Sequence, residues 1–222
     1  MSIVIAVDGT AASGKGTLAK RLARHFGFAH MDSGALYRLT ALAVLEAKGK
    51  PALEADALKG ARAIDITRAG DAAIRTDVVG RAASQVAAIP AVRAALHDFQ
   101  QAFLMNPPGQ SFGAVMDGRD IGTVIAPDAT AKLFVDAAPK VRAHRRWLEL
   151  ESMGIFRDET DLLAEIEARD HADRTRAISP LKQAADADLL DTTDLGIDAA
   201  FAAALALVSP KVESALKARQ RG

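Results

Sequence analysis

A glycine-rich loop near the start of the chain constrains its fold more than any other segment. It follows a short apolar run, Ile3-Val4-Ile5-Ala6-Val7, that is typical of a buried parallel strand. After it, Leu18, Leu22 and Phe26 repeat at the spacing of a buried helix face. A strand, a glycine-rich turn and a helix in this order predict a phosphate-binding loop, formed by Gly9, Thr10, Ala11, Ala12, Ser13, Gly14, Lys15, Gly16 and Thr17.

The chemistry of this loop predicts binding of a nucleoside triphosphate. Backbone N–H groups and the positive N-terminus of the following helix surround an anion, and Lys15 supplies a cation for the outer phosphates. The usual pattern places Ser or Thr directly after the lysine as a ligand of Mg²⁺, whereas here Gly16 intervenes before Thr17. We expect Thr17 to lie near the metal. The alternative is an ordinary glycine turn.

Composition bounds the class of protein. A chain of 222 residues, 50% of them hydrophobic and 25% charged, can bury a large core, and we expect one domain over 1–222 with an inserted subdomain. Lys+Arg and Asp+Glu are 28 each, so no overall field attracts nucleic acid or a membrane. The lack of cysteine excludes disulfides, thiolate zinc sites and a cysteine nucleophile. Without a leader or a long apolar run, we expect a soluble cytoplasmic protein.

Further strands are predicted along the chain. A short one near 28–31 is followed by apolar runs at 113–116, 131–135 and 187–190, and the last three lead into Asp117, Asp136 and Asp191. Alternation of such strands with helices predicts an α/β fold with a three-layer, doubly wound parallel sheet, whose ligands bind at the carboxyl edge. About 80 residues separate the second and third strands, more than a crossover needs. We expect a monophosphate-binding insertion at 33–110.

Helices are expected within this insertion at 33–47, 53–63 and 90–105. Two short β-like pieces, 64–67 and 73–76, favour a small hairpin. At the start of the insertion, Asp32-Ser33-Gly34-Ala35-Leu36-Tyr37-Arg38 places Ser33 to cap a helix and Arg38 one turn further on. This arrangement can hold an anion, although a simple N-cap with an exposed arginine explains it as well.

Charged residues directly follow the strand at 113–116. Phosphoryl-transfer enzymes of this type place an acid here that orders Mg²⁺ through water, so Asp117 is the metal candidate. Arg119 and Asp120 lie just beyond, where they can reach a phosphate and a polar base or sugar, respectively. The alternative is a charged tight turn.

The helix predicted at 159–177 changes character along one face. Leu162 and Ile166 are apolar, and the same spacing continues as Arg169, Asp173 and Arg176. Two guanidinium groups on a helix that crosses a cleft can hold phosphate oxygens while the carboxylate orients them. A solvated, salt-bridged helix end is the alternative.

A lid is expected at 142–158. Arg142, Arg145 and Arg146 lie on the preceding helix, and Arg157 lies in the connection. Mobile arginines that close over a transferring phosphoryl group neutralise its charge and exclude water. Arg145 and Arg146 can instead pair with Glu149 one turn on.

No histidine falls in a metal-ligand spacing or beside a plausible serine nucleophile. An acceptor phosphate needs no general base, because its second pKa near 6 leaves it largely dianionic at neutral pH. Catalysis would then be positioning and charge neutralisation by Lys15, Arg119, Arg169 and Arg176.

The loop ending Gly-Lys-Gly-Thr resembles the nucleoside monophosphate kinases, and further motifs resemble the bacterial cytidylate kinases over nearly the whole chain. These motifs, in the family's order, are 32–38, Ala83-Ser84-Gln85-Val86-Ala87, Pro90-Ala91-Val92-Arg93, Asp117-Gly118-Arg119-Asp120-Ile121-Gly122-Thr123 and 169–176. The resemblance implies transfer of phosphoryl from ATP to CMP or dCMP with Mg²⁺. Longer members carry a three-stranded sheet in the insertion, for which residues 64–76 leave room for a hairpin at most.

By motif, Ser33 and Asp120 resemble residues that contact the nucleoside, and Asp173 resembles one near the sugar. Arg38, Arg93, Arg169 and Arg176 resemble residues that contact the acceptor phosphate or its cytosine. Two alternatives stay open: another small kinase acting on UMP, dTMP, AMP or an alcohol, and a nucleotide-dependent switch. We expect ATP and CMP or dCMP as partners, with no nucleic acid or membrane, and a monomer.

Overall fold

The structure is a computed structural model that describes residues 2–220. The chain divides into two compact units. The sheet unit comprises Met1–Met31 and Pro107–Gly222, and the helical unit comprises Asp32–Asn106.

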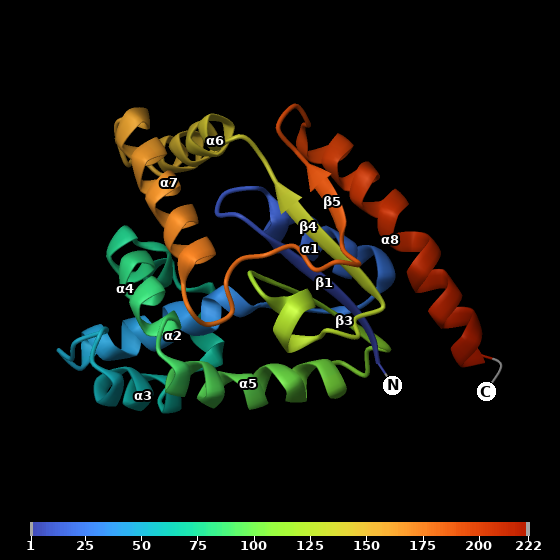
Figure 1. Ribbon diagram of the computed structural model, residues 1–222, viewed down its shortest axis with the longest axis horizontal. Helices are drawn as coiled ribbons and strands as arrows, with labels where there is room; N and C mark the ends of the chain where they lie inside the picture. The colour runs from blue at the N-terminus through green and yellow to red at the C-terminus, as the bar shows by residue number, and fades with distance from the viewer. Residues whose placement is uncertain (1, 221–222) are drawn as a thin grey trace. The chain divides into compact units, whose positions relative to one another are not determined.

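The sheet unit contains five strands in the order β2-β3-β1-β4-β5. Their bounds are β1 Ile3–Gly9, β2 Ala29–Asp32, β3 Gly113–Gly118, β4 Ala131–Asp136 and β5 Asp188–Asp191. β1 runs parallel to both β3 and β4, and β4 runs parallel to β5 (Figure 1). The predicted α/β fold with a parallel sheet is confirmed. The strand order reverses at β1, so the carboxyl end of β1 is the switch point where such sheets bind ligands.

Two helices cover one face of this sheet with a continuous core. α1 (Lys15–Phe26) contributes Leu18 and Leu22, and α8 (Ile197–Gln220) contributes a stripe at four-residue spacing: Ala200, Ala204, Val208 and Val212. They pack against strand residues such as Ile5 and Val115. The i, i+4 repeat after the glycine-rich loop therefore marks a buried helix face, as predicted.

Helix α8 is also long and apolar enough to cross a membrane, judged by length and composition, with a mean hydropathy of 1.4 over its most apolar window. No apolar run of membrane-spanning length was predicted from the sequence. Four of its residues lie in the core of the sheet unit, and one such helix is weak evidence for a membrane span.

The rest of the sheet unit carries three further elements: the π-helical turn η3 (Ile121–Ile125), α6 (Pro139–Ser152) and α7 (Glu159–Thr175). α6 and α7 form a hairpin with a small core of its own, made by Ala143, Leu150, Leu162 and Ile166. Ala12 of the phosphate-binding loop packs against this core. The loop and the hairpin are therefore in direct apolar contact.

The helical unit contains α2 (Ser33–Glu46), α3 (Glu54–Arg62), η1 (Ile66–Gly70), η2 (Ala72–Arg75), α4 (Asp77–Ala87) and α5 (Pro90–Met105). The three helices predicted in this region are confirmed. Helix α4 was not predicted. It is nevertheless amphipathic, with Val79, Ala82, Ala83 and Val86 buried on one face and the Thr76 hydroxyl capping its N-terminus.

The hairpin predicted at 64–67 and 73–76 is wrong. These residues form the two 3₁₀ turns η1 and η2. Asp65 accepts hydrogen bonds from the backbone N–H and hydroxyl of Thr67, which favours a helical turn over a strand. Arg68 ties the turn to Glu46 on α2 and to Asp71.

Candidate functional site

The phosphate-binding loop leaves β1 through an unusually close backbone approach. Gly9 has φ of 152°, and a Cβ at this position would lie 2.0 Å from the carbonyl oxygen of Val135. The loop then passes through Ala12 and Gly14, both with positive φ, before α1 begins at Lys15. The N-terminus of α1 thus points at the loop, which is the arrangement that binds phosphate.

Side chains from three other elements hold the loop in this shape. Arg142 on α6 donates from Nη1 to the carbonyl of Ala11 at 3.1 Å, and Thr192, after β5, donates its hydroxyl to the carbonyl of Ser13 at 3.0 Å. The Thr10 hydroxyl donates to Asp136 Oδ1 at 2.7 Å. In a trans peptide the N–H points opposite to the C=O. The N–H groups of Ala12 and Gly14 therefore face away from these supports and toward the ligand side.

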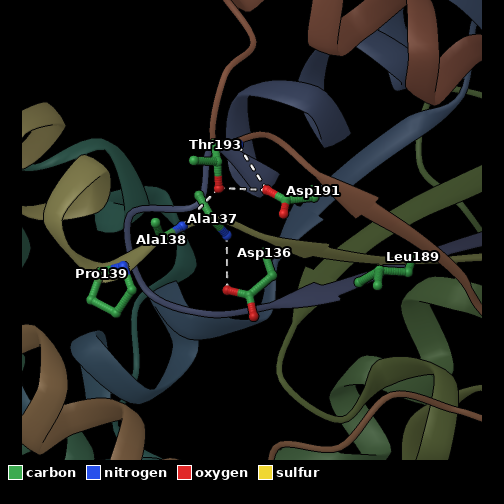
Figure 2. A pocket seen from close by; sticks show the side chains of 7 residues that line it. All are labelled: Asp136, Ala137, Ala138, Pro139, Leu189, Asp191 and Thr193. Atoms are coloured by element: carbon green, nitrogen blue, oxygen red, sulfur yellow. Dashed lines mark hydrogen bonds between the residues drawn. The ribbon is translucent and has the colours of Figure 1, made fainter.

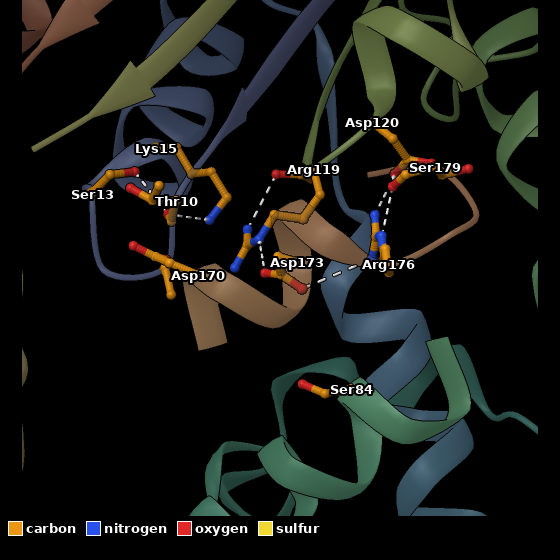
Figure 3. Close-up of polar contacts among 12 residues, drawn as sticks. Thr10, Ser13, Lys15, Ser84, Arg119, Asp120, Asp170, Asp173, Arg176 and Ser179 are labelled. Carbon is orange, nitrogen blue, oxygen red and sulfur yellow. Dashed lines mark hydrogen bonds and ion pairs between the residues drawn. The ribbon is translucent and has the colours of Figure 1, made fainter. Parts of the chain in front are cut away.

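Lys15 has a partner within the loop. Its Nζ donates to the carbonyl of Thr10 at 3.3 Å, and the Ser13 hydroxyl donates to the same oxygen at 3.0 Å (Figure 3). A long hydrogen bond to a carbonyl is easily exchanged for a stronger one to an anion. Lys15 is thus placed to move onto a phosphate.

Asp117, the predicted metal residue, lies buried beside this loop at the end of β3. Its Oδ2 would lie 3.5 Å from a Cβ placed on Gly16, and its Oδ1 lies 2.8 Å from Nε2 of His30 at β2. A carboxylate beside Gly16, the residue before Thr17, offers the kind of hard oxygen ligand that Mg²⁺ prefers. Thr17 and Asp117 stay the predicted metal residues. Sequence reasoning overlooked His30.

A second cluster of charges lies at the end of β3 and on α7. Arg119 donates from Nε to Asp173 Oδ2 at 2.8 Å, and Arg176 lies 3.9 Å from Asp173 Oδ1 and 4.0 Å from Asp120 Oδ1 (Figure 3). Arg176 also donates from Nε to the carbonyl of Ser179 at 2.6 Å. The structure thus brings together four of the predicted residues. A fifth, Arg169, acts on the same Asp173 carboxylate, and we call Arg119, Asp120, Arg169, Asp173 and Arg176 the acceptor cluster.

The pKa of Asp173 reports the electrostatic balance of this cluster. Burial pushes this pKa upward, but the positive charges of Arg119, Arg169 and Arg176, with the hydrogen bond from Arg119, together hold it below its ordinary value. Arg169 is therefore close enough to act on the same carboxylate. Three guanidinium groups against two carboxylates leave a net positive charge, which suits an anionic ligand.

The four arginines of the expected lid have different surroundings. Arg142 is fully buried; besides Ala11, it donates to the carbonyl of Ala137 and to Asp170 Oδ2 at 2.5 Å. Arg145 donates to Thr192 and to the carbonyl of Leu195. By contrast, Arg146 and Arg157 pair with half-exposed glutamates, Glu149 and Glu165, at 2.8 Å. Arg142 and Arg145 therefore support the loops at the sheet edge.

The helical unit holds the other predicted residues. Asp32, and not Ser33, caps α2 by accepting from the N–H of Ala35, because the helix begins one residue earlier than a Ser33 cap requires. Ser33 is buried in the first turn. Arg38 donates to the carbonyl of Ile74 at 2.8 Å, and Arg93 lies over the ring of Tyr37 at 5.6 Å.

A pocket of about 280 Å³ lies at the carboxyl ends of β4 and β5 (Figure 2), lined by Asp136, Ala137, Ala138, Pro139, Leu189, Asp191 and Thr193. Its walls are hydrogen-bonded: Asp191 accepts from the N–H and hydroxyl of Thr193, which in turn accepts from the N–H of Ala138. Asp136 joins the pocket to the phosphate-binding loop through Thr10. The pocket was not predicted, although two acids that end strands line it.

Asp8 is another functional candidate that sequence reasoning missed. It lies at the end of β1, directly before Gly9, and accepts hydrogen bonds from the N–H groups of Ile121 at 2.8 Å and Gly122 at 2.7 Å. Burial raises the pKa of Asp8 from 3.8 to about 6; the two hydrogen bonds and Arg119 oppose the rise, and Asp120 adds to it. The signal was present, since β1 ends in an acid as β3, β4 and β5 do.

Comparison with known proteins adds to this geometry. The sequence model of the cytidylate kinase family matches residues 5–209. A cytidylate kinase of Afipia carboxidovorans is 53% identical over 206 residues, which cover 93% of this chain and 97% of that protein. A cytidylate kinase of a Bradyrhizobium species is 51% identical over 219 residues, covering 99% of this chain and all of that protein.

Solved structures share the fold of this chain. An uncharacterised protein from Eubacterium ventriosum superposes with a TM-score of 0.52 at 16% identity, covering 93% of this chain and 98% of that one. At this identity the likeness shows the fold alone.

Proposed function

The chain belongs to the cytidylate kinase family, and we propose on this premise that it transfers the γ-phosphoryl group of ATP to CMP or dCMP, giving ADP and CDP or dCDP. The observation that carries the mechanism is the pairing of two sites in the sheet unit. A preshaped phosphate-binding loop lies at the end of β1, and the positively charged acceptor cluster lies at β3 and α7.

The loop binds the triphosphate of ATP in this proposal. The N–H groups of Ala12 and Gly14 donate hydrogen bonds to the β-phosphate, and Lys15 leaves the Thr10 carbonyl for the β and γ oxygens. Thr17 and Asp117 would hold the Mg²⁺ that is bound with ATP, and this ion would neutralise phosphate charge. The pocket at Asp136 and Thr193 adjoins the loop, and we assign it to the nucleoside of the donor.

The acceptor cluster handles the monophosphate. Arg119, Arg169 and Arg176 bind its oxygens, while Asp173 and Asp120 orient these guanidinium groups and face the sugar and base. Arg176 gains most from this exchange, because its 3.9 and 4.0 Å ion pairs are weaker than a direct contact with phosphate. Ser33, Arg38 and Arg93 of the helical unit are the remaining acceptor residues, by the family motifs.

No general base is required in this scheme, since the acceptor phosphate is already an anionic nucleophile at neutral pH. Catalysis consists of holding the two phosphates in line and stabilising the charge between them. For the lid, we propose Arg146 and Arg157 as the closing arginines, because their glutamate partners are half-exposed and readily exchanged. We further propose that the protein acts as a monomer in the cytoplasm.

The test is ADP production from Mg·ATP with CMP, dCMP, UMP, AMP, dTMP or no acceptor. We expect turnover with CMP and dCMP well above the other acceptors. Turnover confined to another nucleotide would keep the kinase and reject this acceptor. No acceptor-dependent turnover, with ATP still bound, would instead favour a switch or a non-nucleotide substrate.

A further inference from the structure

The carboxylate of Asp8 joins the strand that carries the phosphate-binding loop to the turn that follows Arg119 and Asp120. Asp8 is 5% exposed, and its two oxygens each accept one backbone N–H, from Ile121 and from Gly122, at 2.8 and 2.7 Å. Hydrogen bonds to an ionised acceptor are shorter and stronger than neutral ones. The contact therefore fixes the turn in two places.

The backbone hydrogen bonds of this turn explain why it needs an acceptor from elsewhere in the chain. In η3 the N–H groups of Val124 and Ile125 donate to the carbonyl of Asp120, and the N–H of Ala126 donates to that of Ile121. The first N–H groups of any helix lie before its first internal acceptor. In η3 these groups belong to Ile121 and Gly122, which are buried, so Asp8 supplies what the turn cannot supply itself.

The turn has little freedom to settle elsewhere. A Cβ on Gly122 would lie 3.1 Å from Cδ of Lys132 and 3.4 Å from Oδ2 of Asp8. Gly122 is thus enclosed between β4 and the Asp8 carboxylate. The two residues directly before the turn, Arg119 and Asp120, belong to the acceptor cluster, so the position of the turn determines where they lie.

We propose that Asp8 is a positioning residue for the acceptor: its carboxylate holds the turn at Ile121 and Gly122 and thereby sets Arg119 and Asp120 for binding the monophosphate nucleotide. This inference rests on the proposed function for the identity of the acceptor. Asp8 lies one residue before Gly9. The same residue therefore connects the start of the phosphate-binding loop to the turn that follows Arg119 and Asp120.

The charges around Asp8 bear on when this contact holds. Asp120 and Arg119 act on it from the turn, with opposite signs, and Lys132 packs over Gly122 from β4 with its Nζ bound to Asp186. The carboxylate needs both oxygens as acceptors, and protonation turns one of them into a donor. Below about pH 6 the turn is therefore expected to loosen.

The test uses Asp8→Asn, whose amide keeps one acceptor and replaces the other by a donor. We expect the dissociation constant for CMP to rise roughly 10-fold or more, since a buried N–H loses its partner, while that for Mg·ADP stays within about twofold. Hydrogen exchange should quicken at the amides of Ile121 and Gly122 and stay unchanged at those of Ala12 and Gly14. Asp188→Asn, at the amino end of β5, is the matched control.

A second readout separates positioning from general stability. The ratio of wild-type to Asp8→Asn affinity for CMP should be constant above pH 7 and fall below about pH 6, because titration of CMP itself cancels in the ratio. Gly122→Ala places a methyl group against Lys132 and Asp8 in the same turn. It should weaken CMP binding less than Asp8→Asn does.

Three outcomes overturn the proposal: unchanged CMP affinity in Asp8→Asn, equal losses for CMP and Mg·ADP, or a pH-independent ratio. If the wild-type protein turns over no CMP, the proposed function fails separately. Hydrogen exchange at Ile121 and Gly122 then decides alone whether Asp8 holds the turn.

Discussion

The phosphate-binding loop and the acceptor cluster lie in the same unit but are stabilised in opposite ways. The loop is held from behind: the buried Arg142 and the Thr192 hydroxyl donate to its carbonyls, and Asp136 accepts from its Thr10 hydroxyl, at 2.7 to 3.1 Å. The acceptor cluster has one support from a neutral group in the contacts described above, the hydrogen bond that Arg176 donates to the carbonyl of Ser179. Its charged side chains hold one another, at distances from 2.8 to 4.0 Å.

This difference separates two ways of binding phosphate. A loop whose supports lie on its far side is already organised for its ligand, so binding costs little rearrangement. A cluster of mutually paired ions must exchange partners, and each ion pair lost offsets part of the new contact. We therefore expect variants of the loop to slow phosphoryl transfer to any acceptor. Variants of the cluster should selectively weaken binding and use of the monophosphate.

The largest expected effect is on the donor side. Lys15→Ala should lower kcat roughly 10³-fold, because it removes the cation that neutralises the transferring phosphoryl group. Stopped assays of ADP formation measure this, with circular dichroism to show that the fold persists. Lys20→Ala, an exposed lysine of the same helix, is the control and should be near wild type. A mild effect of Lys15→Ala would contradict the donor assignment.

Next comes the support behind the loop. Arg142→Ala should lower the free energy of unfolding by about 3–5 kcal/mol, because it leaves Asp170 buried and without its cation. Urea denaturation measures the change. Arg146→Ala, which breaks the half-exposed pair with Glu149, should change it by less than about 1 kcal/mol. Similar values for both variants would remove the distinction between a buried support and a surface pair.

The pH dependence of stability tests Asp8, which adjoins both regions. Its pKa is raised from 3.8 to about 6 in the folded protein, so the native state holds this proton more tightly than the unfolded chain. The stabilising contribution of the protonated form is present below pH 3.8 and is lost as pH rises through about 6, because the desolvation of the buried carboxylate outweighs its two hydrogen bonds even though these loosen on protonation. Relative to Asp8→Asn, the wild type should lose about 3 kcal/mol of unfolding free energy between these limits. A difference that does not vary with pH would contradict this.

The smallest of these effects sharpens the acceptor side. Arg176→Ala should lower kcat/KM for CMP roughly 10²-fold, as removal of one stabilising donor does, with the dissociation constant for Mg·ATP unchanged. Arg24→Ala is the control, because Arg24 is exposed on α1 and belongs to neither region. Equal losses for donor and acceptor in Arg176→Ala would show that the two regions are not independent.

The local sequence pattern was enough to predict the strands and helices that have a regular apolar period. The apolar runs before Asp117, Asp136 and Asp191 and the i, i+4 stripe of Leu18 and Leu22 identified the sheet and α1, because burial imposes these periods directly. The same reasoning failed at 64–76, where both β-like pieces are short. There Asp65 and Thr67 satisfy each other in a turn, an outcome that side-chain hydrogen bonds decide.

The candidate site divides in the same way. Gly9 to Thr17 are recognisable because loop chemistry is local in sequence. His30 beside Asp117 and Asp8 beneath Ile121 are not, since their partners lie 87 and 113 residues away. Arg142 shows the remaining difficulty: sequence spacing placed it correctly on a helix after β4, yet only the tertiary structure shows it facing the interior.

The approach of Gly9 to Val135 also restricts how this gene can change over time. Every missense codon at position 9 introduces a Cβ, and at 2.0 Å from a carbonyl oxygen no Cβ can be accommodated without moving two neighbouring strands. Gly27, at the end of α1, also has positive φ but has open space around it, so asparagine is a tolerable replacement there. Position 27 can therefore accept a substitution, whereas at position 9 only synonymous codon changes preserve the fold.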